Sequence, residues 1–124
     1  SRFMLAIKNI TAELEKIPTM VFDEIDTGIS GLMAQMVALK LNAVSRKYQA
    51  IVVTHLPQIA AMGDANFVIE KAENAGRTET TVRQLSPAEK VAEISRLMGG
   101  ANIGEFGALH AQELIAWALS QKSQ

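Results

Sequence analysis

TMVFDE at residues 19–24 and AIVVTH at residues 50–55 decide the fold of this chain. Each stretch is a short apolar run without alternation that ends abruptly in polar residues. That pattern is typical of strands covered on both faces within a parallel sheet. Between the two runs, apolar residues recur at helical spacing from Met33 to Val44. Strand, helix and strand together predict a right-handed βαβ unit.

The same kind of pattern extends outward from this unit. Upstream, apolar residues spaced by three or four from Phe3 to Ile17 predict a helix that ends at Pro18. Downstream, the sequence predicts a short helix at 57–62, two strands at 66–71 and 78–85 joined around Gly76, and helices at 87–97 and 104–119. The predicted fold class is therefore α/β, with mostly parallel strands flanked by helices and a C-terminal β-hairpin.

Length and composition indicate one globular domain over residues 1–124. The chain is 48% hydrophobic, has a formal net charge of −1 and contains no cysteine. The hydrophobic content excludes a mainly disordered chain. The near-zero net charge argues against binding to nucleic acid or membranes by bulk charge. The absence of cysteine excludes thiol chemistry. No apolar stretch has the roughly 18–20 residues of a membrane helix, so we expect no membrane partner. Because the chain opens on Ser1, we expect it to be a piece of a longer polypeptide.

The candidate catalytic residues lie at or just after the ends of the two predicted strands. Asp23 and Glu24 end the first strand, and His55 follows the second. Ligands bind at the carboxyl ends of the strands in open α/β sheets. Four apolar residues followed by two acids form a Walker B pattern, in which the first acid holds Mg²⁺ and the second polarises an attacking water. The alternative is that the acids simply end a strand and that the histidine is an ordinary loop residue.

Two longer stretches carry a resemblance to a known family. DEIDTGISG at residues 23–31 and VTHLPQIAAM at residues 53–62 are similar to the C-terminal part of the RecN family, and Ser1-Arg2 resembles the tail of its LSGGELSR signature. RecN proteins are bacterial DNA-repair ATPases related to SMC proteins, with ABC-type heads. The resemblance implies that residues 1–124 form the C-terminal lobe of a P-loop NTPase head of this type.

The resemblance also implies roles for single residues in binding and hydrolysing ATP. Asp23 would support Mg²⁺, Glu24 would activate water for attack on the γ-phosphate, and His55 would contact that phosphate. Asp26 would belong to the D-loop near the nucleotide of a second head. Ser1 and Arg2 would follow the signature that caps ATP on the opposite subunit.

The chain contains no G-x-x-x-x-G-K-[ST] phosphate loop. It therefore lacks the backbone nest and the lysine that hold ATP phosphates in this class, and we expect this lobe to be inactive alone. The implied partners are the N-terminal lobe of the same polypeptide, a second head in a homodimer, and DNA bound by the full-length protein. The implied location is the bacterial cytoplasm, at the nucleoid.

Two other functions remain open at this point. One is a non-catalytic module that only dimerises heads or recruits partners. The other is a stand-alone Mg²⁺-dependent phosphohydrolase built on Asp23, Glu24 and Asp26, whose spacing after a strand allows them to cluster around a metal. The remaining conspicuous side chains have structural interpretations: core packing for Met33, Met36 and Trp117, and exposed positions for His110, Arg77 and Arg83.

Overall fold

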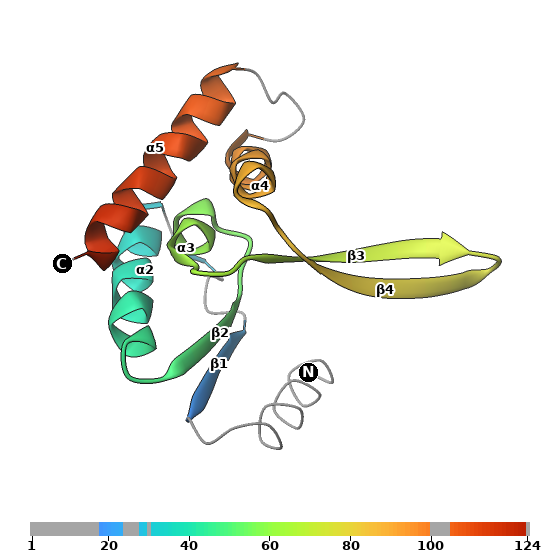
Figure 1. The fold of residues 1–124 in the computed structure, drawn as a ribbon, viewed down its shortest axis with the longest axis horizontal. Coiled ribbons are helices and arrows are strands. Elements are labelled where there is room, and N and C mark those ends of the chain that lie inside the picture. Colours follow the sequence, from blue (N-terminus) through green and yellow to red (C-terminus); the bar gives the residue numbers. More distant parts are fainter. Residues whose placement is uncertain (1–17, 24–27, 30, 100–104, 124) are drawn as a thin grey trace.

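The computed structural model describes residues 18–23, 28–29, 31–99 and 105–123. The elements, in chain order, are β1 (Thr19–Asp23), α2 (Gly31–Ser45), β2 (Gln49–Val53), α3 (Pro57–Met62), β3 (Phe67–Asn74), β4 (Arg77–Gln84), α4 (Pro87–Gly99) and α5 (Glu105–Lys122) (Figure 1). The helix predicted before Pro18 lies outside the described residues. Every other predicted element is present, which confirms the α/β class.

β1 and β2 form a two-stranded parallel sheet, and α2 is the crossover between them. Thr19 pairs with Gln49 at one end of the ladder, and Asp23 pairs with Val53 at the other. The pairing begins one residue earlier, because the Gln49 amide donates a hydrogen bond to the Pro18 carbonyl at 3.1 Å. Since the strands run in the same direction, both carboxyl ends lie at one edge of the sheet.

The hydrophobic core lies between the helices rather than on the sheet. α3 contacts α2, α4 and α5, and Figure 1 shows it enclosed by them. Small side chains allow this close packing, since four alanines in α2 and α5 have no exposed surface. The buried members of the core are Ala38, Leu41, Ile59, Ala61, Met62, Ile94, Ala111 and Ala118.

The expected cover on both faces of β1 and β2 is wrong for the described part of the chain. No residue of either strand is fully buried, because the helices pack mainly on one another. The expected core positions of Met33 and Met36 are also wrong, since these side chains are 47% and 51% exposed. Ala34 and Ala38 occupy the inward positions of α2 instead. Trp117 packs against the core, as predicted.

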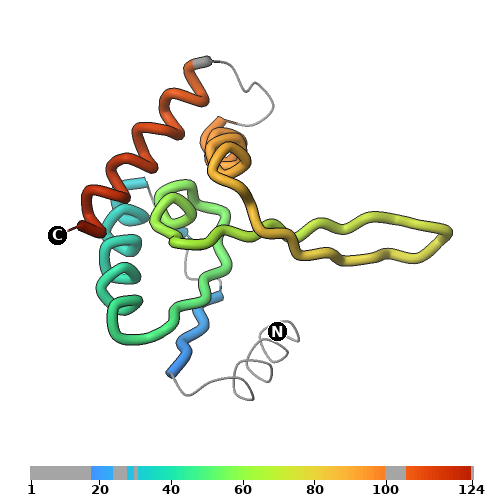
Figure 2. Tube along the Cα trace, viewed as in Figure 1, coloured from blue at the N-terminus to red at the C-terminus, as the bar shows by residue number. Residues whose placement is uncertain are grey.

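β3 and β4 form an antiparallel hairpin that extends away from the helices (Figures 1 and 2). Asn74 pairs with Arg77 across a two-residue turn. Ala75 and Gly76 have φ values of 54° and 77°, the positive values that a type I′ turn requires at both central positions. Every residue of the two strands except Val68 is exposed. The hairpin therefore contributes almost no side chain to the core.

Candidate functional site

The register of the parallel sheet brings two of the predicted site residues to one edge. Asp23 is the last residue of β1 and is partly buried. Its pairing partner, Val53, is the last residue of β2, and His55 follows two residues later in an exposed position. A carboxylate and an imidazole thus lie at the carboxyl ends of adjacent parallel strands. This is the edge at which open α/β sheets bind their ligands.

The segment that carries His55 is short and fixed at both ends. The Thr54 hydroxyl accepts a hydrogen bond from the Leu56 amide at 3.0 Å, which turns the chain immediately around His55. Pro57 then begins α3, where its fixed φ favours the first helical turn. Within α3, Ile59 is buried in the core and anchors the helix. The backbone at His55 is therefore set by β2 on one side and by the core on the other.

The C-terminal end of α3 is fastened by polar contacts as well. Asn66 donates from its amide nitrogen to the Ala60 carbonyl at 2.7 Å, and Lys90 of α4 donates from Nζ to the Gly63 carbonyl at 2.8 Å. Lys90 is partly buried, and this burial, together with the nearby Lys122 charge, lowers the pKa of its ammonium group. Asn66 and Lys90 thus hold the C-terminal half of α3 in place.

Gln58 is a residue of this edge that the motifs do not single out. It lies in the first turn of α3, three residues after His55, and its amide nitrogen lies 3.3 Å from the point where a Cβ on Gly31 would stand. Its amide oxygen is buried and has no hydrogen-bond partner within the described residues. The only sequence signal for this side chain is its place inside the VTHLPQIAAM stretch.

The other predicted site residues cannot be placed. Glu24, Asp26, Ser1 and Arg2 lie outside the described residues. The structure therefore tests the common edge of Asp23 and His55 and leaves the remaining assignments as predictions. Within the described ranges, no group of three or more His, Asp or Glu side chains is placed to hold a metal ion.

A second feature of the sheet is the cavity along β2. It has a volume of about 760 Å³ and lies between β2, the base of the hairpin and α4. Ile51 and Val53 line it from the strand, Phe67 and Ile69 from the hairpin, and Leu97 from α4. β2 pairs with β1 on its other side, and within the described residues no strand pairs with its cavity side. The cavity therefore runs beside an open, apolar strand edge.

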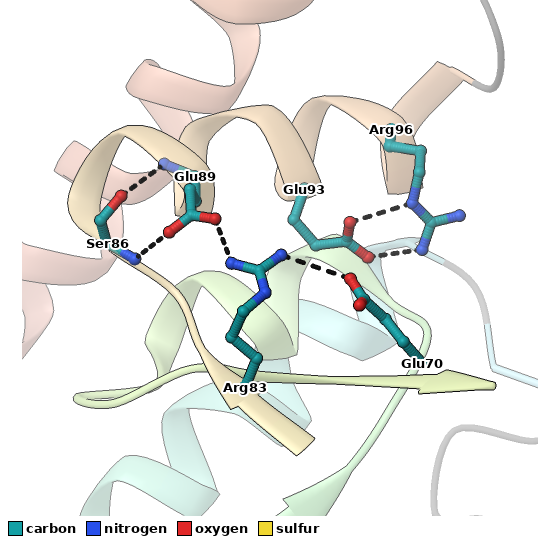
Figure 3. A network of polar contacts seen from close by, with 6 residues as sticks. All are labelled: Glu70, Arg83, Ser86, Glu89, Glu93 and Arg96. Carbon is teal, nitrogen blue, oxygen red and sulfur yellow. Dashed lines mark hydrogen bonds and ion pairs between the residues drawn. The ribbon is translucent and has the colours of Figure 1, made fainter. Parts of the chain in front are cut away.

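A polar network joins the hairpin to α4 (Figure 3). Arg83 of β4 forms ion pairs with Glu70 of β3, at 3.3 Å, and with Glu89 of α4. Glu89 also accepts a hydrogen bond from the Ser86 amide at 3.0 Å, while the Ser86 hydroxyl accepts one from the Glu89 amide at 3.2 Å. These reciprocal bonds form a capping box at the start of α4. The Ser86 amide and then Arg83 lower the pKa of the Glu89 carboxyl.

Comparison with known proteins confirms the resemblance seen in the sequence. The chain is 46% identical over 118 residues to the DNA repair protein RecN of Bacillus subtilis, covering 95% of this chain. It is 44% identical over 115 residues to RecN of Haemophilus influenzae, covering 93% of this chain. The chain spans about a fifth of the length of these curated relatives. No protein-family model matches it.

A solved structure supports the fold. A chain from work on ATP-driven dimerization and DNA-stimulated activation of SMC ATPases matches 80% of this chain with a TM-score of 0.53. The match covers 59% of that chain at 21% sequence identity. Most of this chain therefore shares its fold with part of that chain, which is consistent with the expected partial P-loop NTPase lobe. In the described part of the chain, no helix is long and apolar enough to span a membrane.

Proposed function

We propose that this chain, which is similar to RecN proteins over nearly its whole length, is the C-terminal lobe of their ABC-type ATPase head. In the complete protein, the head would bind and hydrolyse ATP during DNA double-strand-break repair. The observation that carries this proposal is the register of β1 and β2, which sets Asp23 and His55 at one sheet edge. Residues 1–124 would form one structural unit of that head.

Asp23 fits the role of a magnesium ligand. Its carboxylate is a hard oxygen donor, and it lies, partly buried, at the carboxyl end of a parallel strand. Glu24, the next residue, would take the proton of the attacking water. His55 would donate a hydrogen bond to the γ-phosphate, with its backbone fixed by Thr54 and Pro57. Mg²⁺, when bound, neutralises charge on the phosphates.

The remaining assignments concern the contact between two heads. Asp26 follows the Walker B acids in sequence and would lie near the nucleotide of the second head. Ser1 and Arg2 would support the signature that covers that nucleotide. The proposed assembly is a homodimer with two ATP molecules between the heads. Hydrolysis of the ATP would separate the heads and would be coupled to the handling of DNA.

The first partner of this lobe would be the N-terminal lobe of its own polypeptide. The open edge of β2 and the apolar cavity beside it support this proposal, because an edge strand with apolar side chains invites another strand. The missing phosphate loop would come from that lobe, since the present sequence contains none. The lobe alone would then bind no ATP productively and would show no turnover.

ATP turnover of this chain, alone and co-produced with the segment that precedes it in its gene, tests the proposal. We expect activity only in the combination. Activity of the chain alone would overturn the proposal in favour of a stand-alone Mg²⁺-dependent phosphohydrolase. If the combination binds ATP and dimerises without turnover, the chain is a non-catalytic interaction module.

The role of Glu24 is tested in the same combination with Glu24→Gln. We expect ATP binding to persist and turnover to fall about 100-fold or more, because the amide cannot accept the proton from water. Glu113→Gln, on the exposed surface of α5, is the matched control and should turn over normally. Unchanged turnover in the Glu24 variant would contradict the assignment.

A further inference from the structure

Gln58 has a side chain that packing alone does not explain. Its amide oxygen is buried and accepts no hydrogen bond from any described residue. A buried acceptor without a donor has lost its hydrogen bonds to water and gained none in return, which costs stability. An apolar side chain of similar length, such as methionine, would fill the same space without this cost. The lobe therefore carries an amide at a position where stability favours a hydrocarbon.

The position of Gln58 lies between the two segments that carry the site. α3 begins two residues after His55, and α2 is the helix that follows β1 and Asp23. The Gln58 amide reaches across to the first residue of α2, where glycine leaves room for it: a Cβ on Gly31 would stand 3.3 Å from the Gln58 nitrogen. This side chain therefore projects from the first turn of α3 toward the start of α2.

We propose that Gln58 is a positioning residue of the nucleotide site, an inference that rests on the proposed function. Its side chain sets the separation between the starts of α2 and α3, and with it the spacing between the Asp23 and His55 segments. Its amide oxygen serves as the acceptor for a hydrogen-bond donor that is present when the site is loaded with ATP. In the lobe without ATP this oxygen has no donor, so the folded lobe is less stable than it would be with an apolar side chain at this position.

The test is Gln58→Met in the full-length protein, compared with the unchanged protein for thermal stability, KM for ATP and kcat. Methionine keeps the volume and removes the amide. We expect a melting temperature without ATP that is equal or higher, and a KM for ATP raised about threefold or more, because the hydrogen bond of the loaded state is lost. We expect a kcat lowered about 10-fold or more, because small misplacements of reacting groups slow chemistry strongly. A side chain that only fills space would leave kcat unchanged.

Two further variants make every outcome decisive. Gln112→Met, at an exposed position of α5, removes the same amide from the surface and should change none of the three quantities. Glu24→Gln separates this inference from the function on which it rests. If Glu24→Gln lowers turnover and Gln58→Met does not, the role of Gln58 is wrong and the proposed function stands. If neither lowers turnover, both are wrong. Should Gln58→Met fold poorly, Gln58→Leu carries the same test.

Discussion

Among the described glycines, Gly107 of α5 leaves the least room for a side chain. A Cβ at this position would stand 2.6 Å from the hydroxyl oxygen of Ser95, which is itself 3% exposed. Contacts this short force neighbouring atoms to move. The Ser95 oxygen is also buried without a hydrogen-bond partner in the described structure. Packing between the two helices therefore depends on the absence of a side chain at one position.

We expect Gly107→Ala to lower the free energy of unfolding by about 1–2 kcal/mol, since the clash outweighs the roughly 1 kcal/mol that alanine gains in a helix. Urea denaturation measures the difference. Gly99→Ala is the matched control, because a Cβ there meets no atom within 4 Å. In a Ser95→Ala background the penalty of Gly107→Ala should largely disappear. A penalty that persists there would show that Ser95 is not its cause.

At single residues, the sequence predicts positions that depend on strand direction better than positions that depend on packing. Asp23 and His55 could be assigned to one sheet edge because strand direction alone decides that placement. Gln58 could not be singled out, since its unpaired oxygen depends on the approach of α2. Met33 and Met36 were placed on the wrong side of their helix, because alanines at neighbouring positions allow closer packing than the bulkier stripe.

The elements themselves were predictable, but the contacts that orient them were not. The capping box at Ser86 and Glu89 has a local sequence pattern, a serine followed three residues later by a glutamate. Arg83 was expected on a solvated strand face, and it is exposed, yet it pairs with Glu70 and Glu89. Arg83 and Glu70 lie on the same face of the hairpin as diagonal neighbours, a proximity that follows only once the register is known. The network therefore links the base of the hairpin to α4.

This network predicts a pH dependence of stability. The pKa of the Glu89 carboxyl is lowered in the folded protein by the Ser86 amide and then by Arg83. The ionised form is thus favoured by folding, and its contribution is present above the ordinary glutamate pKa of about 4.3 and lost as pH falls through the lower folded value. We expect the stability difference between the unchanged chain and Glu89→Gln to be largest at pH 7 and to shrink on acidification toward pH 3.

Urea denaturation of both proteins between pH 3 and pH 7 measures this difference. Arg83→Met serves as the comparison, because it removes the second cause and leaves the Ser86 bond in place. The pH-dependent difference due to Glu89 should therefore be reduced but still present in that background. Stability curves of the unchanged chain and Glu89→Gln that run parallel across the whole pH range would contradict the assignment of the lowered pKa.

At the scale of the molecule, the sequence pattern of β1 and β2 is typical of a sheet with more strands and more complete cover than the described chain contains. The strands have the unbroken apolar pattern of a sheet covered on both faces, yet none of their residues is fully buried. The sequence shows the apolar pattern of the strands but not how deeply they are buried, because burial of a strand depends on the layers that pack against it. The proposed N-terminal lobe would extend the sheet from the open edge of β2, beside the cavity.

This proposal predicts which amides change when the preceding segment is present. The Gln49 amide donates toward β1, to the Pro18 carbonyl. Because successive amides of a strand point to opposite edges, those of Ala50 and Val52 point to the open edge. Hydrogen exchange followed by NMR should show these two amides slowing about 100-fold or more on co-production, since each would gain a buried hydrogen bond. Amides at the hairpin tip, Ala75 and Gly76, should be unaffected. Unchanged exchange at Ala50 and Val52, in a combination that turns over ATP, would place the N-terminal lobe elsewhere on this molecule.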